Sequence, residues 1–586
     1  MSSRRLTGRH AGGPLKRLTA VERESPPARP EHVSVGIYRS DESTRVRWTD
    51  RLRKRRARRS FGSWLASRPN GHPGAGGGQE LSTGRIPMRL LNKSRFLAGC
   101  QCPRRLWLGS FAPELGARPD VGLDARLETG IEIGRHARAL FPGGVLVDEA
   151  GQHDDPVTRT RTPLADPAVP AIFEAAFVHA GVRVRVDVLE RLSDGGWGVR
   201  EVKSGTRVRD VHLQDAAVQR FVLEGSGLRV RSVEIIHVDA SYVRGEDGID
   251  WLRFFRRADV TTEVERLLPD VPARVEALRA VLSRAEAPVV EPDGHCFTPH
   301  TCEFWIHCTR DKPPDWIFYL PGHPDHFAAL RAAGIERIVD IPDDFPLSPR
   351  QLRVRNALRS RDEFVSHDLV QALASLGPPA DYLDFETANP AIPLYSGTRP
   401  YEHIPFQWSL HRLEVGGRLV HHEFLASGRG DPRREFAESL LALLGPASHP
   451  ILVYSEFESR ILGALAQALP DLAGAIGALT SRLHDLLPVV RAHLYHPGFS
   501  CSFSLKAVAP ALAPGFGYDD LGDVAEGSAA ADALLRLALG RVGSVEEENR
   551  LRAALLAYCE RDTMALVALH RAMCERAGRV AGIRRP

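Results

Sequence analysis

The chain has 586 residues, 43% of them hydrophobic and 26% charged, a composition typical of globular proteins and a length too great for one hydrophobic core. It contains no run of 18 apolar residues, which excludes a transmembrane helix, and its Arg-rich beginning lacks the apolar segment of a secretory signal. Residues 1–86 hold 19 Lys and Arg against 7 Asp and Glu, so the net charge of +4 is no evidence that the rest of the chain binds nucleic acid.

Residues 1–86 form the first predicted segment. They contain the basic run RLRKRRARR at Arg51–Arg59 and a Gly/Pro-rich stretch, without sustained apolar periodicity. This pattern predicts a disordered basic tail or a spurious extension ahead of a natural start at Met88. An arm that contacts phosphate backbones is the alternative interpretation.

Residues 87–310 are predicted to form the first folded domain. After helical sequence from Arg89, strict alternation predicts a strand at Gly181–Leu192, and a Gly-Gly turn leads to a second strand at Trp197–Ser204. A helix at Asp210–Leu223 and a strand at Ser232–Val238 follow. This order of elements resembles the core of the PD-(D/E)XK nucleases.

The charged residues of that core support the resemblance. Asp187 lies on the first strand, Glu201 and Lys203 share one face of the second, and Gln219 lies on the helix. Asp187 and Glu201 could hold Mg²⁺ or Mn²⁺, while Lys203 stabilises charge on a phosphate. A surface salt bridge in a hairpin is the alternative. Such nucleases often carry a histidine upstream, where this chain has Gly134. His136, Glu128 and Glu132 are left open as replacements.

Four cysteines flank this core. Cys296, Cys302 and Cys308 are evenly spaced, and Cys102 precedes them by almost two hundred residues. Four thiolates suit Zn²⁺ or a [4Fe-4S] cluster. The spacing resembles iron-sulfur nucleases of the RecB and CRISPR-associated type, which implies a [4Fe-4S] cluster on these four cysteines, with Zn²⁺ as the alternative. Cys100 and the histidines His295, His300 and His307 are rival ligands. Eight cysteines in all, unevenly placed, favour a reducing cytoplasm over a disulfide framework.

Residues 311–378 are predicted to be a helical connector with two short helices about Gly334. An interdomain spacer is the favoured interpretation. A helix-hairpin-helix element that binds DNA backbone is the alternative.

Residues 379–580 are predicted to form a second α/β domain. Its first strand carries Asp384 and Glu386, which point to the same face because they lie two positions apart. Two neighbouring carboxylates in a half-buried strand repel each other and lose hydration, and a bridging divalent cation removes that cost. An exposed edge strand with two solvated acids is the alternative.

Two later segments complete this pattern. Ile451–Leu462 reads as a strand that enters a helix at Glu458, and Leu551–Leu569 reads as a helix with Tyr558 and Asp562 on one face. The order resembles the tyrosine subtype of the DEDD exonucleases, which have the ribonuclease H-like fold. The resemblance implies that Asp384, Glu386, Glu458 and Asp562 hold two Mg²⁺ or Mn²⁺ ions and that Tyr558 orients the attacking water. Glu458 stands where that family has aspartate, and Glu456 is its rival.

Other polar residues of this domain receive weaker assignments. Asp485 is a candidate support for the metal site, and Ser502, Ser504 and Lys506 are candidates for phosphate contacts. Cys501, Cys559 and Cys574 lack partners at ligand spacing and are predicted to be structural.

Taken together, CPRRLWL, EVKSGT, YLDFET and YCERDT resemble one bacterial family of two-nuclease proteins over residues 89–575. The resemblance implies an α/β protein with a PD-(D/E)XK restriction-endonuclease-like domain followed by a ribonuclease H-like domain. We expect a cytoplasmic, metal-dependent nuclease that combines a 3′–5′ exonuclease with a single-strand-directed nuclease and acts on DNA in repair or defence. The alternatives are a nucleic-acid-binding scaffold with inactive centres and an RNA-processing exonuclease. No Walker loop supplies an ATP motor, and a helicase partner is left open.

Overall fold

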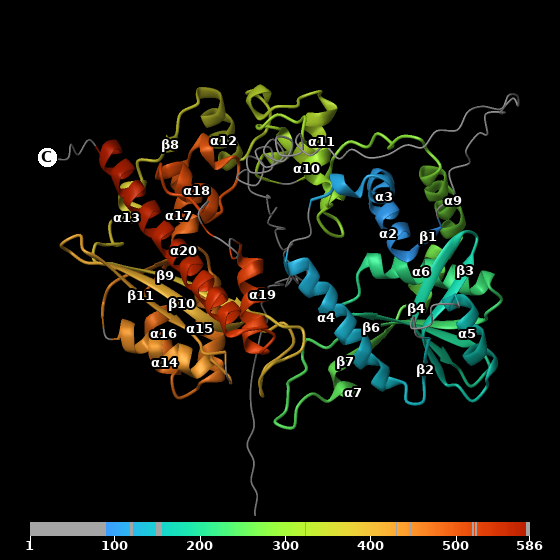
Figure 1. The fold of residues 1–586 in the computed structure, drawn as a ribbon. Helices are drawn as coiled ribbons and strands as arrows, with labels where there is room; N and C mark the ends of the chain where they lie inside the picture. The colour runs from blue at the N-terminus through green and yellow to red at the C-terminus, as the bar shows by residue number, and fades with distance from the viewer. Residues whose placement is uncertain are drawn as a thin grey trace, which may run out of the picture. The chain divides into compact units, whose positions relative to one another are not determined.

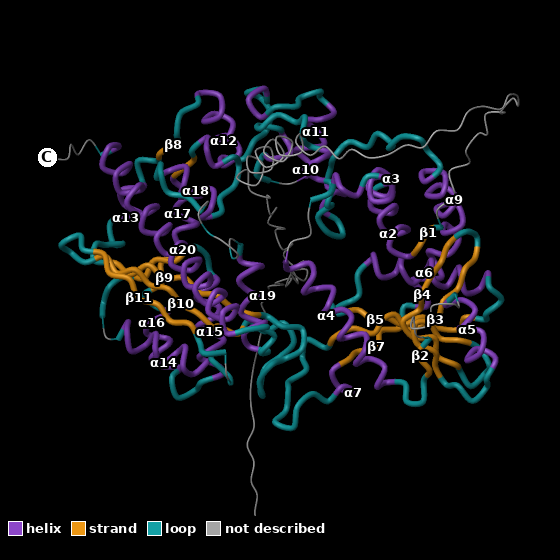
Figure 2. Tube along the Cα trace, viewed as in Figure 1, coloured by secondary structure: helices purple, strands orange, loops and turns teal. Residues whose placement is uncertain are grey.

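The computed structural model describes residues 90–117, 121–147, 155–322, 324–428, 430–445, 447–518, 521, 524 and 526–581. The predicted basic tail, residues 1–86, lies outside the described residues. Within them the chain is a mixed α/β protein with two main β-sheets, coloured orange in Figure 2. None of the helices in this described part combines the length and the apolar character needed to cross a membrane.

The N-terminal half is built on a seven-stranded sheet with the order β2-β3-β4-β5-β6-β7, and β1 pairs with β4 (Figure 1). Its strands are β1 (Leu91–Asn92), β2 (Val145–Leu146), β3 (Ala171–His179), β4 (Val182–Arg191), β5 (Trp197–Lys203), β6 (Val230–Val238) and β7 (Phe255–Asp259). The predicted hairpin is confirmed, since β4 and β5 are antiparallel and β5 pairs in parallel with β6. Gly195 has φ +74°, which explains why a glycine occupies the turn between them.

Helices cover this sheet because alternate strand residues are apolar. The helices of this half are α2 (Lys93–Gln101), α3 (Pro103–Phe111), α4 (Val121–Ala137), α5 (Pro156–Ala165), α6 (Asp210–Gly225), α7 (Trp251–Phe254), α8 (Thr261–Leu267), α9 (Val271–Leu282) and α10 (Trp305–Cys308), of which α10 lies away from the sheet. Val184 and Val186 of β4 share one buried core with Val218 and Val222 of α6. Gln219 lies between Val218 and Val222 in α6, so this packing places it against the sheet.

The C-terminal half is built on a five-stranded sheet with the order β11-β10-β9-β12-β13. Its strands are β9 (Ala380–Ala388), β10 (Ile404–Leu413), β11 (Leu419–Leu425), β12 (Ile451–Val453) and β13 (Leu483–Asp485). β9 is antiparallel to β10 and parallel to β12, so the acidic strand is an interior strand of the sheet. The alternative interpretation of an exposed edge strand is therefore wrong.

The helices of this half are α11 (Pro324–Ala332), α12 (Pro349–Ser360), α13 (Leu369–Leu373), α14 (Arg433–Leu444), α15 (Phe457–Ala468), α16 (Ala473–Thr480), α17 (Leu486–His493), α18 (Leu505–Leu512), α19 (Gly527–Ala538) and α20 (Val545–Val580). Helices α14, α15 and α16 lie on one face of this sheet and α20 lies on the other, whereas α11 and α12 lie away from it (Figure 1). Leu383 and Phe385 of β9 pack against α14, α15 and α16. The intervening residues of β9 therefore face α20, where the Tyr382 hydroxyl lies 2.8 Å from His570 Nδ1.

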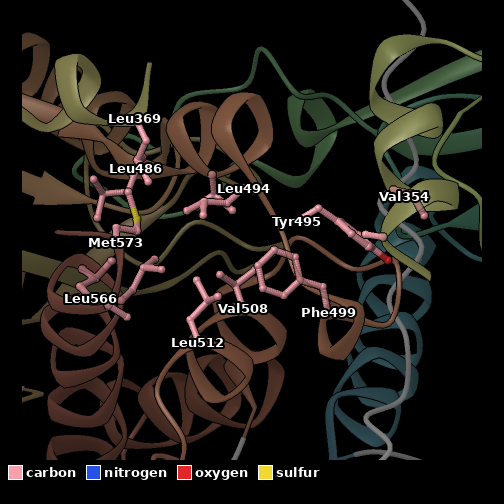
Figure 3. Packing of buried hydrophobic residues seen from close by; sticks show 14 of the residues in the cluster. Val354, Leu369, Leu486, Leu494, Tyr495, Phe499, Val508, Leu512, Leu566 and Met573 are labelled. Carbon is pink, nitrogen blue, oxygen red and sulfur yellow. The ribbon is translucent and has the colours of Figure 1, made fainter. Parts of the chain in front are cut away.

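The segment predicted as a connector contributes to the core of this half. Trp316, Val354 and Leu369 share one buried cluster with Leu486 of α17, Val508 of α18 and residues of α20. Figure 3 shows Val354, Leu369 and Met573 among the apolar side chains of this cluster. In addition, β8 (Phe364–Val365) pairs with β14 (Leu494–Tyr495). Residues 316–376 thus pack as part of the C-terminal core.

Candidate metal centres

Three carboxylates converge on the α20 side of the C-terminal sheet. Asp384 and Glu386 emerge from β9 and Asp562 from α20, and one oxygen of each lies within 4.8 Å of the others. The sequence predicted these shared faces from spacing. Asp384 and Glu386 are two positions apart in a strand, and Asp562 is four positions after Tyr558 in a helix. The Cys559 thiol of α20 lies 3.4 Å from Asp384 Oδ2 and donates a hydrogen bond to it.

Burial and mutual repulsion make this cluster electrostatically costly without a counterion. Burial raises the pKa of Asp384 well above its ordinary value, and repulsion from Asp562 and Glu386 raises it further. The pKa of Glu386 rises for the same reasons, whereas Lys506 opposes the rise. A divalent cation would offset the free-energy cost of ionising these carboxylates, which comes from their burial and their mutual repulsion. Carboxylate oxygens are the ligands that Mg²⁺ and Mn²⁺ prefer.

Glu458 lies beside this cluster at the start of α15. It is 4% exposed, and its Oε2 is a buried atom with no hydrogen-bond partner among the described residues. Burial, Asp485 and Asp562 raise its pKa to about 8. Its neighbour Glu456 is exposed and only precedes the helix, so the buried environment favours Glu458 over that rival. Ser455 lies in the turn between β12 and α15. Its φ of +144° is a strained backbone conformation, and the turn leads into the helix that carries Glu458.

Tyr558 and Lys506 border the carboxylates. The Lys506 ammonium donates to the Tyr558 hydroxyl at 3.0 Å. Burial raises the pKa of Asp562, and Lys506 and the Tyr558 hydrogen bond oppose that rise. Tyr518, which the sequence analysis missed, also interacts with Asp562, and its ring centroid lies 5.3 Å from Lys506 Nζ. Tyr518 lies in a loop, where neither helical nor strand periodicity indicates which way a side chain points. The Ser502 hydroxyl donates a hydrogen bond to the Ser504 hydroxyl just before α18, and Lys506 lies in the first turn of that helix.

Asp485 supports Glu458 indirectly. It caps α17 by accepting a hydrogen bond from the Leu487 amide at 2.8 Å, and its charge raises the pKa of Glu458. Asp485 therefore lies close to the buried glutamate, and its supporting role at a metal site stays a prediction.

The predicted N-terminal residues also meet. Lys203 Nζ donates to Glu201 Oε1 at 2.5 Å, Gln219 Nε2 donates to Glu201 Oε2 at 2.7 Å, and Asp187 Oδ2 accepts from the Val202 amide at 2.7 Å. Glu201 is only 1% exposed, so the alternative of a surface salt bridge is wrong.

Two further residues of this centre were missed. Lys93 of α2 donates to Glu201 Oε1 at 2.6 Å, and Asp215 of α6 accepts from Lys203 at 2.6 Å. Asp215 lies one helical turn before Gln219, a spacing that could have revealed it. Lys93 reaches the site from 108 positions away, and nothing in its local sequence indicates this contact.

The two lysines give this centre a different electrostatic character. Lys203 and Lys93 hold the pKa of Glu201 well below its ordinary value in spite of burial. Burial and then Glu201 raise the pKa of Asp187 to about 7, and they also raise that of Asp215. A metal ion here would compete with two ammonium groups for Glu201.

The residues left open as histidine replacements lie in other contacts. His136 stacks on Trp251 at 3.6 Å between ring centroids, and Glu132 pairs with Arg541 at 3.5 Å. Glu128 acts electrostatically on Asp532. None of the three is among the main causes of the pKa shifts of Asp187, Glu201 or Asp215.

The four predicted cysteines line one pocket. Cys102 precedes α3, Cys296 lies in a short 3₁₀ turn, and Cys308 ends α10. Burial raises the pKa of Cys296 to about 11 and that of Cys302 to about 12. Cys100 instead packs outside the pocket, where Arg274 contacts it at 3.9 Å. Of the rival histidines, His295 lines the pocket, with Nε2 3.6 Å from Cys296 Sγ.

The spacing of the sulfurs bears on the kind of metal group. Tetrahedral Zn²⁺, with Zn–S bonds of about 2.3 Å, holds its sulfurs about 3.8 Å apart. Among the described residues, the cysteine sulfurs do not form a group within 4.8 Å of one another. Four thiols around one pocket are ligands suited either to a single zinc ion or to a multinuclear iron-sulfur cluster.

Comparison with known proteins reaches only part of the C-terminal half. Residues 381–504 match the family described as "Domain of unknown function (DUF2779)". The matched segment contains Asp384, Glu386 and Glu458 and ends before Tyr558 and Asp562. No curated protein matches the chain.

Proposed function

We propose that the C-terminal half is a metal-dependent nuclease that hydrolyses phosphodiester bonds with Asp384, Glu386, Glu458 and Asp562 as ligands of Mg²⁺ or Mn²⁺. The observation that carries this proposal is the convergence of Asp384, Glu386 and Asp562 within 4.8 Å, with Asp562 buried and the other two partly buried. Bound divalent ions would stabilise the charges on the attacking and leaving oxygens.

The chain's own side chains supply the remaining functions. Lys506 fixes the Tyr558 hydroxyl beside Asp562, in a position to orient a water molecule. The ammonium of Lys506 offers a positive charge to a phosphate near the carboxylates. Glu458 Oε2 is buried in the same region and has no hydrogen-bond partner among the described residues, so this oxygen could serve as a metal ligand.

The sheet supports a ribonuclease H-like assignment for this half. The acidic strand β9 lies in the middle of a mixed sheet, and the last long helix, α20, crosses its face with the tyrosine and the final aspartate. Both motifs that carried the sequence resemblance therefore meet at one place.

For the N-terminal half we propose a PD-(D/E)XK nuclease centre in which Asp187 and Glu201 bind the metal ion and Lys203 contacts phosphate. Gln219 holds Glu201 in place from α6. The four-cysteine pocket would hold a [4Fe-4S] cluster on Cys102, Cys296, Cys302 and Cys308 that ties the two ends of this half together.

A second function is favoured by one observation at this centre. Lys93 and Lys203 already neutralise Glu201, which weakens its attraction for a cation. The N-terminal half could therefore bind nucleic acid without cutting it, as a scaffold for the C-terminal nuclease. We propose DNA as the substrate of the active centre, with RNA as the outcome to be tested against it.

The decisive experiment incubates the purified full chain with 3′- or 5′-labelled single- and double-stranded DNA and RNA, in Mg²⁺, Mn²⁺ or EDTA. Asp384→Asn should abolish metal-dependent cleavage by the C-terminal centre, and Glu456→Gln serves as the matched control at an exposed carboxylate. Lys203→Met should remove any second activity. Intact substrate under every condition would refute the nuclease proposal and favour the scaffold.

A further inference from the structure

A second group of metal-ligating side chains lies on the same face of the C-terminal sheet as the acidic cluster. His411 of β10, His421 of β11 and Glu560 of α20 each place one ligand atom within 4.8 Å of the other two. The two histidines are cross-strand partners, and their rings stack with centroids 4.5 Å apart. Two imidazoles with one carboxylate form a ligand set that favours Zn²⁺ over Mg²⁺.

Buried hydroxyl groups fix the orientation of both imidazoles. His411 Nδ1 lies 2.8 Å from Thr563 Oγ1, and His421 Nε2 lies 3.0 Å from Ser409 Oγ. The two hydroxyl oxygens are themselves 2.9 Å apart. Ser409 and Thr563 are fully buried, so this network excludes water.

One arrangement of protons satisfies the whole network. The Thr563 hydroxyl donates to the Glu560 carbonyl at 3.0 Å, so Thr563 Oγ1 accepts from His411 Nδ1 and from the Ser409 hydroxyl. Ser409 Oγ then accepts from His421 Nε2. This arrangement leaves His411 Nε2 and His421 Nδ1 as unprotonated nitrogens, the form that binds metal.

This outer shell is typical of metal-ligating histidines, whose second ring nitrogen bonds to a protein group that sets the tautomer. His421 Nδ1 lies 3.8 Å from Glu560 Oε1, a separation that a shared ion bridges more readily than a direct hydrogen bond. The side chain of His421 is 23% exposed and that of Glu560 is 48% exposed, which gives an ion access from solvent.

We propose that His411, His421 and Glu560 form a Zn²⁺ site separate from the acidic cluster. Three protein ligands leave the fourth tetrahedral position to water. The ion would join β10 and β11 to α20, the helix that also carries Tyr558 and Asp562. Zinc binding would thereby hold α20 against the sheet and stabilise the folded state by mass action.

The test measures Zn²⁺ binding to the full chain by calorimetry in excess Mg²⁺, which occupies oxygen-ligand sites without displacing zinc from imidazole. Glu560→Gln and His421→Ala should each lose one equivalent of bound Zn²⁺. The matched control is His422→Ala, because His422 points to the opposite face of β11 and should leave binding unchanged. The cysteine pocket is unaltered in every variant, so zinc bound there contributes equally.

Two further measurements separate ligation from a general structural effect. Ser409→Ala keeps all three ligands but should weaken binding roughly 10- to 100-fold. Zn²⁺ should raise the thermal midpoint of the wild-type chain and of His422→Ala by more than that of Glu560→Gln, in which only other zinc sites remain. Crystals soaked in Zn²⁺ should show an anomalous peak between His411 and His421. Equal zinc stoichiometry in wild type and Glu560→Gln, or a peak only elsewhere, would overturn the proposal.

Discussion

Asp384 has no positively charged residue among the main influences on its pKa. Its burial and its acidic neighbours all oppose ionisation, and only the Cys559 thiol counteracts them. An ionised carboxylate in this environment destabilises the folded protein unless a cation is bound to it, which is typical of a functional site.

We therefore expect Asp384→Asn to lower metal-dependent cleavage by roughly 100-fold or more, since metal stabilisation of the transition state is worth several kcal/mol. The same change should raise stability in EDTA at pH values where Asp384 is ionised, because it removes a carboxylate whose charge burial and its acidic neighbours oppose. Cleavage rates and urea denaturation of one preparation measure both effects. Unchanged cleavage alongside active Glu456→Gln would place the catalytic metal elsewhere.

The acidic residues also predict how stability depends on pH. The pKa of Glu458 rises from 4.5 to about 8 and that of Asp187 from 3.8 to about 7. The folded state thus binds these protons more tightly than the unfolded chain, so their stabilisation is complete at acidic pH and disappears as the pH rises through the folded values. Metal-free protein should lose stability between about pH 5 and pH 8.

Excess Mg²⁺ should flatten this profile, because the ion replaces the proton at Glu458 and its neighbours. Urea denaturation at a series of pH values, in EDTA and in Mg²⁺, gives the comparison. A metal-free stability that rises steadily toward pH 8 would contradict the shifts.

Lys93 provides a residue-scale test of the N-terminal centre. Lys93→Met leaves Glu201 and Asp215 buried with one ammonium instead of two, and loss of a partner in a buried ion pair costs about 3 kcal/mol. Lys312→Met is the matched control, since Lys312 bridges two half-exposed glutamates and such surface pairs contribute less than about 1 kcal/mol. Denaturation curves in EDTA should show this difference, and equal losses would mean that Lys93 is not part of the centre.

Residue spacing explains which site residues the sequence could reveal. Asp384 with Glu386, and Tyr558 with Asp562, are local pairs whose shared face follows from strand and helix periodicity. Lys93 and Tyr518 reach their centres through contacts between distant segments. Their positions depend on how α2 and the loop after α18 pack, which no local pattern encodes.

At the scale of elements, the cysteine pocket connects α3, near the start of the N-terminal half, with α10 at its end. Cys102→Ser should abolish visible absorbance, iron and acid-labile sulfide in the purified protein. Cys100→Ser should leave all three unchanged, because Cys100 lies outside the pocket. Colourless wild-type protein with one bound zinc would replace the iron-sulfur assignment.

Most elements were predictable because their apolar periodicity is strong. The hairpin of β4 and β5, helix α6 and helix α20 lie where alternating or helical patterns predict them. The start of α2 is harder to predict, because both Asn92 and Ser94 could cap it, and Asn92 does so by accepting from the Arg95 amide at 2.8 Å. Both residues are good caps, and only the backbone geometry selects one.

For the whole molecule, the shared apolar core changes the expected folding unit. A fragment of residues 379–580 lacks Trp316, Val354 and Leu369, which are buried among its own core residues. We expect it to aggregate or to unfold without a cooperative transition, whereas residues 311–581 should unfold cooperatively. Circular dichroism during heating, with gel filtration, distinguishes the two. A stable 379–580 fragment would restore the predicted boundary.

The position of α20 in that core also bears on synthesis in the cell. Leu566, Leu569 and Met573 of this late helix close the cluster begun by Trp316, more than two hundred residues earlier. Until the ribosome releases α20, the nascent segment from Trp316 onward exposes the apolar surface that the helix later covers, and such surfaces attract chaperones and other nascent chains. Translation speed over the last hundred residues should therefore influence the yield of native protein.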